Sequence, residues 1–491
     1  MVNENKLNIT QGKEQFQHEQ DILLKTVLSE RYFLPWRDAF TNPSGPSISD
    51  VPKGHLEIYI TSQCNQKCEY CYLVRHPEIY PKEFLDKNLI LQNLKALYDW
   101  IIENNFSIPQ CEFFTGEIWH SNFGIEILDI TLEYIQKGLK IQQFLIPSNC
   151  SFVRNRAWLD KIQHYINTFA QFGIPLGFSI SVDGKIVDAE ARSGNNSSVV
   201  YTDEFYDTLV EFAKYNGFGF HPMVAACDIE KWIDNYEWWK SIMKKHGLDM
   251  GKVMMLEVRN NDWTDEKIAH FLEFEKYLIN DVLKRHDNNI GDACVDCFGI
   301  NQTYMDKYGR MMEGAEQAAY APHHLAEIDE FLGCTIQNNL TVRLGDLAIC
   351  PCHRTAYNKN LFGWFKKNAE GRIYDITANN PQAAIRLLLV NNVTATLGCD
   401  SCIYNKYCMT PCCGEQMEEF NDMFHLDPVV CKFLKAKHNF LIKYYKEIGF
   451  LDWMDENISP YHVFYLHKEN LMKLYRDVIE EERCEKLEKL R

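Results

Sequence analysis

The sequence lacks the features that would place it in several common classes of protein. No apolar run approaches the roughly 18 residues that a membrane-spanning helix needs, and the N-terminal stretch MVNENKLNITQGKEQFQHEQ has no apolar core like that of a signal peptide. The sequence also shows no internal repeat and no low-complexity segment. These absences predict a cytoplasmic protein with no membrane partner, in a compartment where thiols stay reduced.

Positive charge is scarce as well. The chain of 491 residues has 51 Lys and Arg against 68 Asp and Glu, which gives a formal net charge of −17. Because binding to a phosphate backbone depends on an excess of basic residues, this balance argues against a nucleic-acid partner.

Cysteine, in contrast, is abundant, with 18 residues in the chain. Clustered cysteines in a reducing compartment more often hold a metal than pair with one another. A chain of this length is also too long for one ordinary core, which favours a large domain with one or two smaller ones.

The part of the chain from residue 54 to residue 285 alternates between short apolar segments and longer segments of helical periodicity. The expected strands are residues 55–61, 111–116, 142–149, 176–184, 218–225 and 252–258, and the clearest helices are 85–105 and 156–173. Strands that are each followed by a helix form a parallel sheet with right-handed crossovers. Since six units are fewer than the eight of a complete barrel, the sequence predicts an α/β fold with a partial (β/α)6 barrel of the TIM type.

The rest of the chain differs from this pattern. From about residue 290 to Cys431 the periodicity fades and cysteines and turn residues dominate, so metal ligation is expected to substitute for an apolar core. The predicted organisation is an N-terminal extension (1–53), the barrel (54–285), a linker (286–333), a cysteine-rich domain (334–431) and a C-terminal helical segment (432–491).

The first group of cysteines, Cys64, Cys68 and Cys71, lies in TSQCNQKCEYCYL, directly after the first expected strand. A [4Fe–4S] cluster normally takes four thiolates, so three thiols in one loop leave one iron open. An open position distinguishes a catalytic metal site from a closed structural one. Active sites of parallel barrels lie at the carboxyl ends of the strands, where this loop is expected.

The spacing Cys64-x3-Cys68-x2-Cys71, with Tyr70 before the last cysteine, resembles the signature of the radical S-adenosylmethionine (SAM) superfamily. In that family the open iron binds the amino and carboxylate groups of SAM. Reductive cleavage of SAM then yields a 5′-deoxyadenosyl radical that abstracts a hydrogen from the substrate. The cofactors carry this chemistry, while the protein binds, orients and shields them.

The later strands carry segments similar to the SAM-binding motifs of that family. The resemblance implies that Glu117 contacts the SAM amino group, that the guanidinium of Arg192 contacts its carboxylate, and that Val224 packs on the adenine. The candidate cofactor-binding residues are Tyr70, Gly116, Glu117, Asn149, Ser181, Asp183, Arg192 and Val224.

The second group of cysteines resembles the SPASM extension of radical SAM enzymes, which holds two auxiliary [4Fe–4S] clusters. The resemblance implies that one cluster is ligated by Cys399, Cys402, Cys408 and Cys431. It assigns to the other cluster Cys334, Cys412, either Cys350 or Cys352, and an upstream ligand that is either Cys297 or Cys294. The neighbouring Cys413 is a ligand, a catalytic thiol or an inert residue.

Members with a SPASM extension mostly modify peptides or proteins, through crosslinks, thioether bonds, epimerisation or oxidation. The resemblance therefore implies a ribosomally synthesised peptide or protein substrate with a leader segment, and a reductase, ferredoxin or flavodoxin as electron donor. One alternative is an enzyme of the same type that acts on a small molecule or a cofactor precursor. An alternative of another class is a non-catalytic iron–sulfur protein that only transfers electrons.

Some further residues allow two interpretations. His353, in PCHRT, is a candidate general base or a hydrogen-bond donor to a cluster. Arg259 and Trp263 either line the substrate side of the barrel or are ordinary packing residues. The remaining isolated cysteines are expected to be small apolar fillers of the core; they are Cys111, Cys150, Cys227 and Cys484.

Overall fold

The computed structural model describes the barrel almost completely and the rest of the chain in part. The described residues are 40–41, 55–80, 86–114, 116–120, 123–192, 201–291, 293, 339–350, 352–357, 363–377, 397–405, 408, 412–422, 425–460 and 465–489. The candidate ligands Cys294, Cys297 and Cys334 lie outside the described residues, as does the side chain of Cys413.

The centre of the fold is an eight-stranded sheet with the order β12-β11-β10-β9-β1-β3-β5-β6. Its parallel barrel strands are β1 (His55–Tyr59), β3 (Gln110–Phe114), β5 (Phe144–Ser148) and β6 (Leu176–Ile180). The helices around it are α4 (Lys87–Glu103), α5 (Phe123–Gln136), α6 (Arg156–Gln171), α7 (Lys185–Ala191), α9 (Asp203–Asn216), α10 (Trp232–Lys245) and α11 (Asp265–Arg285). The first four expected strands and both expected helices are therefore confirmed.

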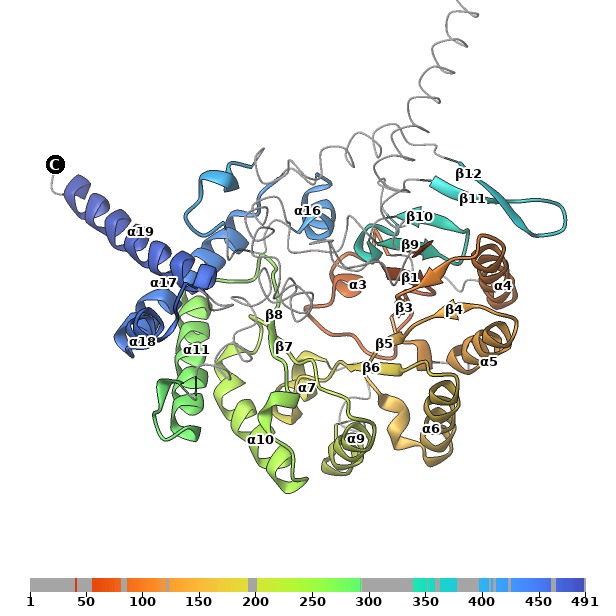
Figure 1. Cartoon of the computed structure of the whole chain (residues 1–491), viewed down its shortest axis with the longest axis horizontal. Helices are drawn as coiled ribbons and strands as arrows, with labels where there is room; N and C mark the ends of the chain where they lie inside the picture. The colour runs from red at the N-terminus through yellow and green to blue at the C-terminus, as the bar shows by residue number, and fades with distance from the viewer. Residues whose placement is uncertain are drawn as a thin grey trace, which may run out of the picture.

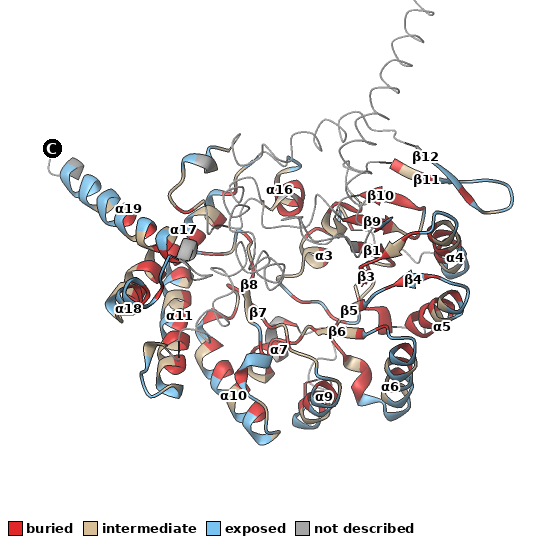
Figure 2. Ribbon diagram, viewed as in Figure 1, coloured by how far each residue is buried: buried red, intermediate tan, exposed pale blue. Residues whose placement is uncertain are grey.

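Side-chain caps and apolar stripes explain where these helices lie. Asp86 accepts hydrogen bonds from the backbone N–H groups of Asn88 and Leu89, and so it fixes the start of α4. Figure 2 shows that α4, α5 and α6 bury the face that packs against the sheet and expose the opposite face. This is the pattern expected of amphipathic helices that cover a parallel sheet.

The last two barrel strands are shorter than the sequence predicts. They are β7 (Met223–Val224) and β8 (Leu256–Glu257), which pair with each other in parallel. Pro222 precedes β7 and has no N–H to donate, so the ladder is interrupted there. Single parallel bridges from Phe220 to Ile180 and to Val253 connect this pair to β6. Figure 1 shows the resulting arc of strands with the helices on its outer side, the partial barrel that was predicted.

Four further strands extend the same sheet and were not predicted. They are β9 (Leu340–Arg343), β10 (Ala348–Cys350), β11 (Gly363–Lys367) and β12 (Ile373–Thr377). β9 pairs in parallel with β1, and the next three strands follow antiparallel. Leu340, Val342 and Ile349 are fully buried in the same core as the barrel. This part of the cysteine-rich region therefore packs on the barrel core, and the sheet continues across the predicted domain boundary.

The C-terminal part is helical, as predicted. Its helices are α16 (Cys413–Phe420), α17 (Pro428–Glu447), α18 (Phe450–Asn457) and α19 (Tyr465–Lys489). The last three bury a second apolar cluster that includes Leu441, Leu451 and Leu471. In Figure 1, α16 lies on the open side of the arc of strands, and α17 lies beside α11, α18 and α19. Within the described residues, every helix is too short or too polar to span a membrane.

Candidate active site

The cysteine loop is the segment 61–71, which leaves the carboxyl end of β1. The segment that follows β3 is pressed against it, because Gly116 donates a backbone hydrogen bond to Thr61 (2.8 Å) and Glu117 donates one to Gln63 (2.8 Å). A Cβ atom on Gly116 would lie 2.2 Å from the carbonyl oxygen of Gln63. Only glycine allows this approach, so Gly116 sets the position of the cysteine loop.

Side chains from the segment after β5 brace the same loop. Asn149 donates from Nδ2 to Oδ1 of Asn65 at 2.8 Å, and Asn65 donates from its own Nδ2 to Oγ of Ser151 at 2.8 Å. Gln66 donates from Nε2 to the hydroxyl of Tyr201 at 2.5 Å, ahead of α9. Three of the following strand–helix units therefore hold the loop from different sides.

Arg192, after α7, is buried beside the first group of cysteines. Its Nε lies 3.4 Å from Sγ of Cys68 and 3.6 Å from Oδ2 of Asp183, and its Nη1 lies 3.7 Å from Oδ1 of Asp188. It also donates to the carbonyl oxygen of Ser181. A buried guanidinium needs such partners. Burial by itself would lower the pKa of Arg192, but the negative charges around it, that of Asp183 first, together outweigh burial and raise that pKa, so the guanidinium stays ionised.

The acidic residues around this guanidinium are themselves buried. Asp183 accepts from the hydroxyl of Tyr70 and, at 2.8 Å, from the backbone N–H of Met223 at the start of β7. Burial, and then the negative charge of Asp183, raise the pKa of Asp188 to about 7. The network thus joins the cysteine loop to the ends of β6 and β7, where Val224 is buried.

Glu117 is a buried carboxylate in the segment that follows β3 and is pressed against the cysteine loop. One of its oxygens accepts from the backbone N–H of Asn149 at 2.8 Å, and the other accepts from Oγ of Ser148 at 3.0 Å. Burial raises the pKa of Glu117 to about 7 despite these hydrogen bonds. Glu117 is therefore an inward-facing carboxylate held in one place by the segment after β5.

The three thiols of the loop lie close enough to influence one another. Cys68 is buried, whereas Cys64 and Cys71 are partly exposed. Burial, followed by the neighbouring Cys68, raises the pKa of Cys71 to about 11, and burial also raises the pKa of Cys64. Within the described residues, no three His, Cys, Asp or Glu side chains converge as metal ligands. The loop thus has the three thiols that a three-thiolate site needs, but in this structure the three side chains do not converge on one point.

Asp228 is a residue of this site that the sequence analysis did not single out. It lies after β7 and is 4% exposed, and its Oδ1 accepts from Nε1 of Trp232 at 2.9 Å. Its Oδ2 is buried and has no hydrogen-bond partner in the described parts of the chain. Such an orphaned acceptor at the carboxyl end of a strand is expected where a polar ligand binds, so the site fits a polar cofactor such as SAM. The sign in the sequence that could have identified Asp228 was its position soon after the expected strand 218–225.

The candidate ligands of the first auxiliary cluster lie in two different settings. Cys350 is fully buried on β10, and burial raises the pKa of its thiol to about 12. Cys352 is partly exposed and precedes a short 3-10 helix (His353–Thr355). Arg354, two residues later, lies with Nη1 at 3.8 Å from Sγ of Cys412 and donates from Nε to Glu418 at 2.9 Å. The structure therefore brings the segment of Cys352 together with that of Cys412.

Glu57 is a second residue that the sequence analysis missed, because a strand residue gave no sign of a functional role. It is buried on β1 and accepts from the backbone N–H of His353 at 3.0 Å, while Nδ1 of His353 lies 3.4 Å from its other oxygen. Thr341 of β9 donates to the same carboxylate at 2.6 Å. The His353 ring stacks on Phe114 with centroids 3.8 Å apart. Glu57 and Phe114 therefore fix the imidazole beside the end of β3.

The candidate ligands of the second auxiliary cluster lie around the start of α17. Cys402 donates its backbone N–H to the carbonyl of Cys399 at 2.9 Å. The pKa of Cys431 is raised, first by burial, and Cys402 contributes to this rise. Cys408 packs against the barrel core. The two segments that carry these cysteines therefore lie near each other.

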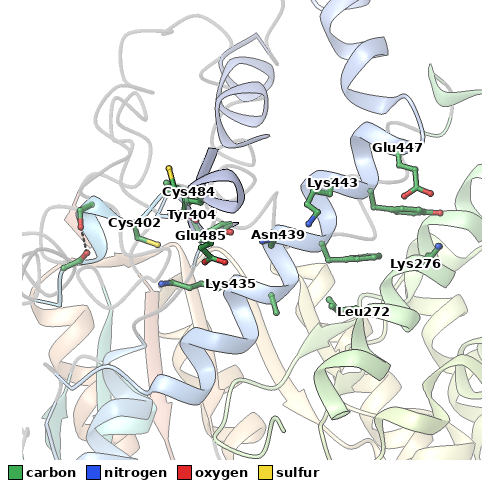
Figure 3. A pocket seen from close by; sticks show the side chains of 17 residues that line it. Leu272, Lys276, Cys402, Tyr404, Lys435, Asn439, Lys443, Glu447, Cys484 and Glu485 are labelled. Carbon is green, nitrogen blue, oxygen red and sulfur yellow. Dashed lines mark hydrogen bonds between the residues drawn. The ribbon is translucent and has the colours of Figure 1, made fainter. Parts of the chain in front are cut away.

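A groove of about 1020 Å³ opens beside Cys402, between α11, α17 and α19 (Figure 3). Lys276, Lys435 and Lys443 line it together with Tyr404, and so does Cys484 of α19. Because Cys484 is exposed, the expectation that it fills a core is wrong, whereas Cys111 and Cys150 are fully buried as expected.

Arg259 and Trp263 follow β8 and have different environments. Trp263 is buried, stacks on Phe433 of α17 with centroids 4.1 Å apart, and donates from Nε1 to the carbonyl of Val258 at 2.8 Å. It is therefore a packing residue. Arg259 is held by Glu257, with Nη2 at 3.1 Å from Oε1, at the carboxyl end of the strand.

Comparisons with known proteins agree with this architecture. No family model matches the sequence, and no curated protein matches it. The structure is similar to that of a hexahistidine-tagged form of anSMEcpe with bound AdoMet, with a TM-score of 0.50 and 14% identity over 85% of this chain and 98% of that chain. Native anSMEcpe with bound AdoMet and Cp18Cys peptide aligns with a TM-score of 0.48 and 14% identity, over 80% of this chain and 98% of that chain. The first of these similarities shows that the chain shares the fold of anSMEcpe.

Proposed function

We propose that the chain is a radical SAM enzyme that modifies a ribosomally synthesised peptide or protein. The observation that carries this proposal is the cysteine loop at the carboxyl end of β1, which Gly116, Asn149 and Arg192 brace from three neighbouring units. Its three thiols suit a [4Fe–4S] cluster with one open iron. When bound, the cluster and SAM supply a 5′-deoxyadenosyl radical that abstracts a hydrogen from the substrate.

The protein's own residues bind and orient the cofactor in this proposal. Arg192 already lies 3.4 Å from Cys68 through its Nε, so a carboxylate bound beside that thiol is within reach of its guanidinium. Glu117 accepts a hydrogen bond from the SAM amino group on the other side of the loop. Val224 contacts the adenine, and Asp228 offers its orphaned oxygen to a polar group of the cofactor.

We assign the ligands of the auxiliary clusters from the cysteine spacing and choose between Cys350 and Cys352 from the structure. Cys352, with Cys412 and the upstream Cys334 and Cys297, holds the first cluster, because Cys350 is enclosed within the sheet, whereas Cys352 is partly exposed and Arg354, two residues later, approaches Cys412. The second cluster is held by Cys399, Cys402, Cys408 and Cys431. The groove beside Cys402 is where we expect a ferredoxin, a flavodoxin or a reductase to approach, since it opens next to these cysteines.

His353 is the proposed proton acceptor for the substrate. The carboxylate of Glu57 lies 3.4 Å from its Nδ1, and this placement orients the imidazole and favours one tautomer. Glu57 acts as a positioning residue. If His353 only donates a hydrogen bond to a cluster, His353→Gln should still form product. If His353 accepts a proton from the substrate, His353→Gln should not form product, because an amide is not a base.

A direct test uses the anaerobically reconstituted protein with SAM and dithionite. The proposal expects 5′-deoxyadenosine from the wild type and none from Cys68→Ala, whose auxiliary clusters persist. A wild type that forms no 5′-deoxyadenosine would support the rival interpretation, a non-catalytic electron-transfer protein. If 5′-deoxyadenosine forms but only small molecules, and no peptide, increase its yield, the substrate class is the alternative one.

A further inference from the structure

The helix α16 carries two buried polar side chains that the proposed chemistry does not use. Glu415 is 5% exposed and Gln416 is 3% exposed. Among the residues that the structure describes, Oε1 of Glu415 has no hydrogen-bond partner, and neither Oε1 nor Nε2 of Gln416 has one. We name these two residues the α16 pair.

Buried polar atoms without partners are rare in folded proteins, because each one loses its hydrogen bonds to water and gains none in return. The helix that carries them is otherwise tightly packed. Gly414 lies so close to Arg354 that a Cβ atom there would be 2.7 Å from the Cβ of Arg354, and Met417 belongs to the barrel core. Three unpaired atoms on one turn of a well-packed helix therefore need a specific explanation.

The charged residues near the pair are already engaged elsewhere. The guanidinium of Arg354 donates to Glu418, and its closest approach to Glu415 is 4.0 Å, at Oε2. Arg259 contributes to the electrostatic environment of Glu415 but is hydrogen-bonded to Glu257. The neighbouring charged groups thus bind other residues, and Oε1 of Glu415 and the side-chain amide of Gln416 have no hydrogen-bond partner among the described residues.

The position of the pair is suited to binding a substrate. Nη1 of Arg354, two residues after Cys352, lies 4.0 Å from Oε2 of Glu415, and the charge of Arg259, which follows β8 at the carboxyl edge of the barrel, also acts on Glu415. Figure 1 shows α16 on the open side of the arc of strands. The pair is therefore close to the segment of Cys352 and on the side of the strand ends.

We propose that the α16 pair is a subsite that binds a peptide group of the substrate's main chain. A primary amide presents one acceptor and one donor side by side, which complements the N–H and C=O of a peptide bond. The orphaned oxygen of Glu415 accepts a second N–H, and such contacts recognise a main chain whatever its side chains are. This inference rests on the proposed function for the identity of the substrate as a peptide.

The test combines stability with peptide retention in anaerobically reconstituted protein without SAM or reductant. Gln416→Leu removes two unpaired buried atoms, so its unfolding temperature should rise above that of the wild type. The matched control is Asn93→Leu, since Asn93 is also buried but donates to the carbonyl of Leu344 at 2.6 Å and accepts from Lys367 at 2.5 Å. This control should lower the unfolding temperature and leave peptide retention unchanged.

The probe is a pool of randomised, capped dodecapeptides, and the comparison is the same pool with its backbone amides N-methylated. The wild type should retain the unmodified pool more strongly, and Gln416→Leu should weaken retention about tenfold and abolish the difference. Glu415→Gln, which keeps the shape of the side chain, should weaken retention by a smaller factor. Equal retention of both pools by the wild type, or wild-type retention by Gln416→Leu, would overturn the proposal.

A fall in the unfolding temperature of Gln416→Leu to the level of Asn93→Leu would also overturn it, because the amide would then be structural. Failure of the proposed function is a separate result. It is recorded as the absence of 5′-deoxyadenosine from the wild type, in an assay that does not involve peptide retention.

Discussion

The close approach at Gly116 gives the most direct prediction about the cysteine loop. In Gly116→Ala, the new Cβ would lie 2.2 Å from the carbonyl oxygen of Gln63, 2.6 Å from its carbonyl carbon and 2.9 Å from the carbonyl oxygen of Ser62. All three atoms belong to the backbone, so no side-chain rotation relieves the contact. The loop must move by roughly 1 Å to restore ordinary van der Waals separation.

The energetic effect follows from that displacement. Overpacking of this kind costs about 1–3 kcal/mol, and the two backbone hydrogen bonds of 2.8 Å that join the segments are strained together. If the strain is relieved by opening the loop, the affinity for SAM falls by about 5- to 150-fold. Isothermal titration of SAM into the reconstituted protein measures this loss directly.

A matched substitution separates this effect from a general sensitivity of barrel glycines. Gly177, on β6, has no atom closer than 3.5 Å to a built Cβ, so Gly177→Ala should bind SAM as the wild type does. If Gly116→Ala kept the wild-type affinity for SAM and the wild-type yield of 5′-deoxyadenosine, Gly116 would not set the position of the loop.

Five other substitutions test separate parts of the site. Arg192→Met removes the counter-ion of two buried carboxylates and should destabilise the protein by about 3–5 kcal/mol and abolish SAM binding, whereas unchanged denaturant unfolding would contradict the buried network. Burial raises the pKa of Asp228 from its usual 3.8 to about 7, so the folded protein loses stability as pH rises from about 4 to about 7. The unfolding temperature of Asp228→Asn should therefore exceed that of the wild type by more at pH 8 than at pH 4. An equal difference at both pH values would refute this assignment. Cys352→Ser should lower the iron content while Cys350→Ala should lower only the stability, and the opposite result in an iron assay would reverse our choice of ligand. Cys402→Ala should lower both iron content and unfolding temperature, since ligand loss in a metal-folded region is a loss of folding energy, and an unaltered variant would exclude the second auxiliary cluster.

The barrel was predictable because its strands and helices are local patterns. The apolar segments that became β1, β3, β5 and β6 are short and bounded by polar or glycine residues, and each is followed by a helix with a clear apolar stripe. β7 and β8 are shorter than predicted. A strand continues only where the backbone N–H groups of the paired strands can donate hydrogen bonds, and Pro222 has no N–H.

The extension of the sheet by β9 to β12 depends on long-range pairing, which local patterns do not encode. β9 pairs Leu340 with Leu56 of β1, and nearly the whole barrel lies between these two residues in the sequence. A local signal was present, since LTVR and LAIC flank the turn at Gly345 and Asp346, as in a hairpin. The density of cysteines around it led us to expect metal ligation instead of strands.

The same distinction applies to the candidate site. Motif spacing selected Gly116, Glu117, Asn149 and Arg192, and all four contact the cysteine loop or its supports. The pairing of Glu57 with His353 and the unpaired atoms of Gln416 were invisible in the sequence, because both depend on which groups meet after folding.

The central claim is that three thiols of the loop after β1 hold a cluster whose fourth iron position binds SAM. Electron–nuclear double resonance on the reduced protein with SAM labelled by ¹⁵N in its amino group and ¹⁷O in its carboxylate tests this most directly. The account predicts that both labels couple to the cluster and that Cys68→Ala lacks the couplings. A reduced cluster with no coupling to either label would contradict it, and so would a protein side chain at the fourth position.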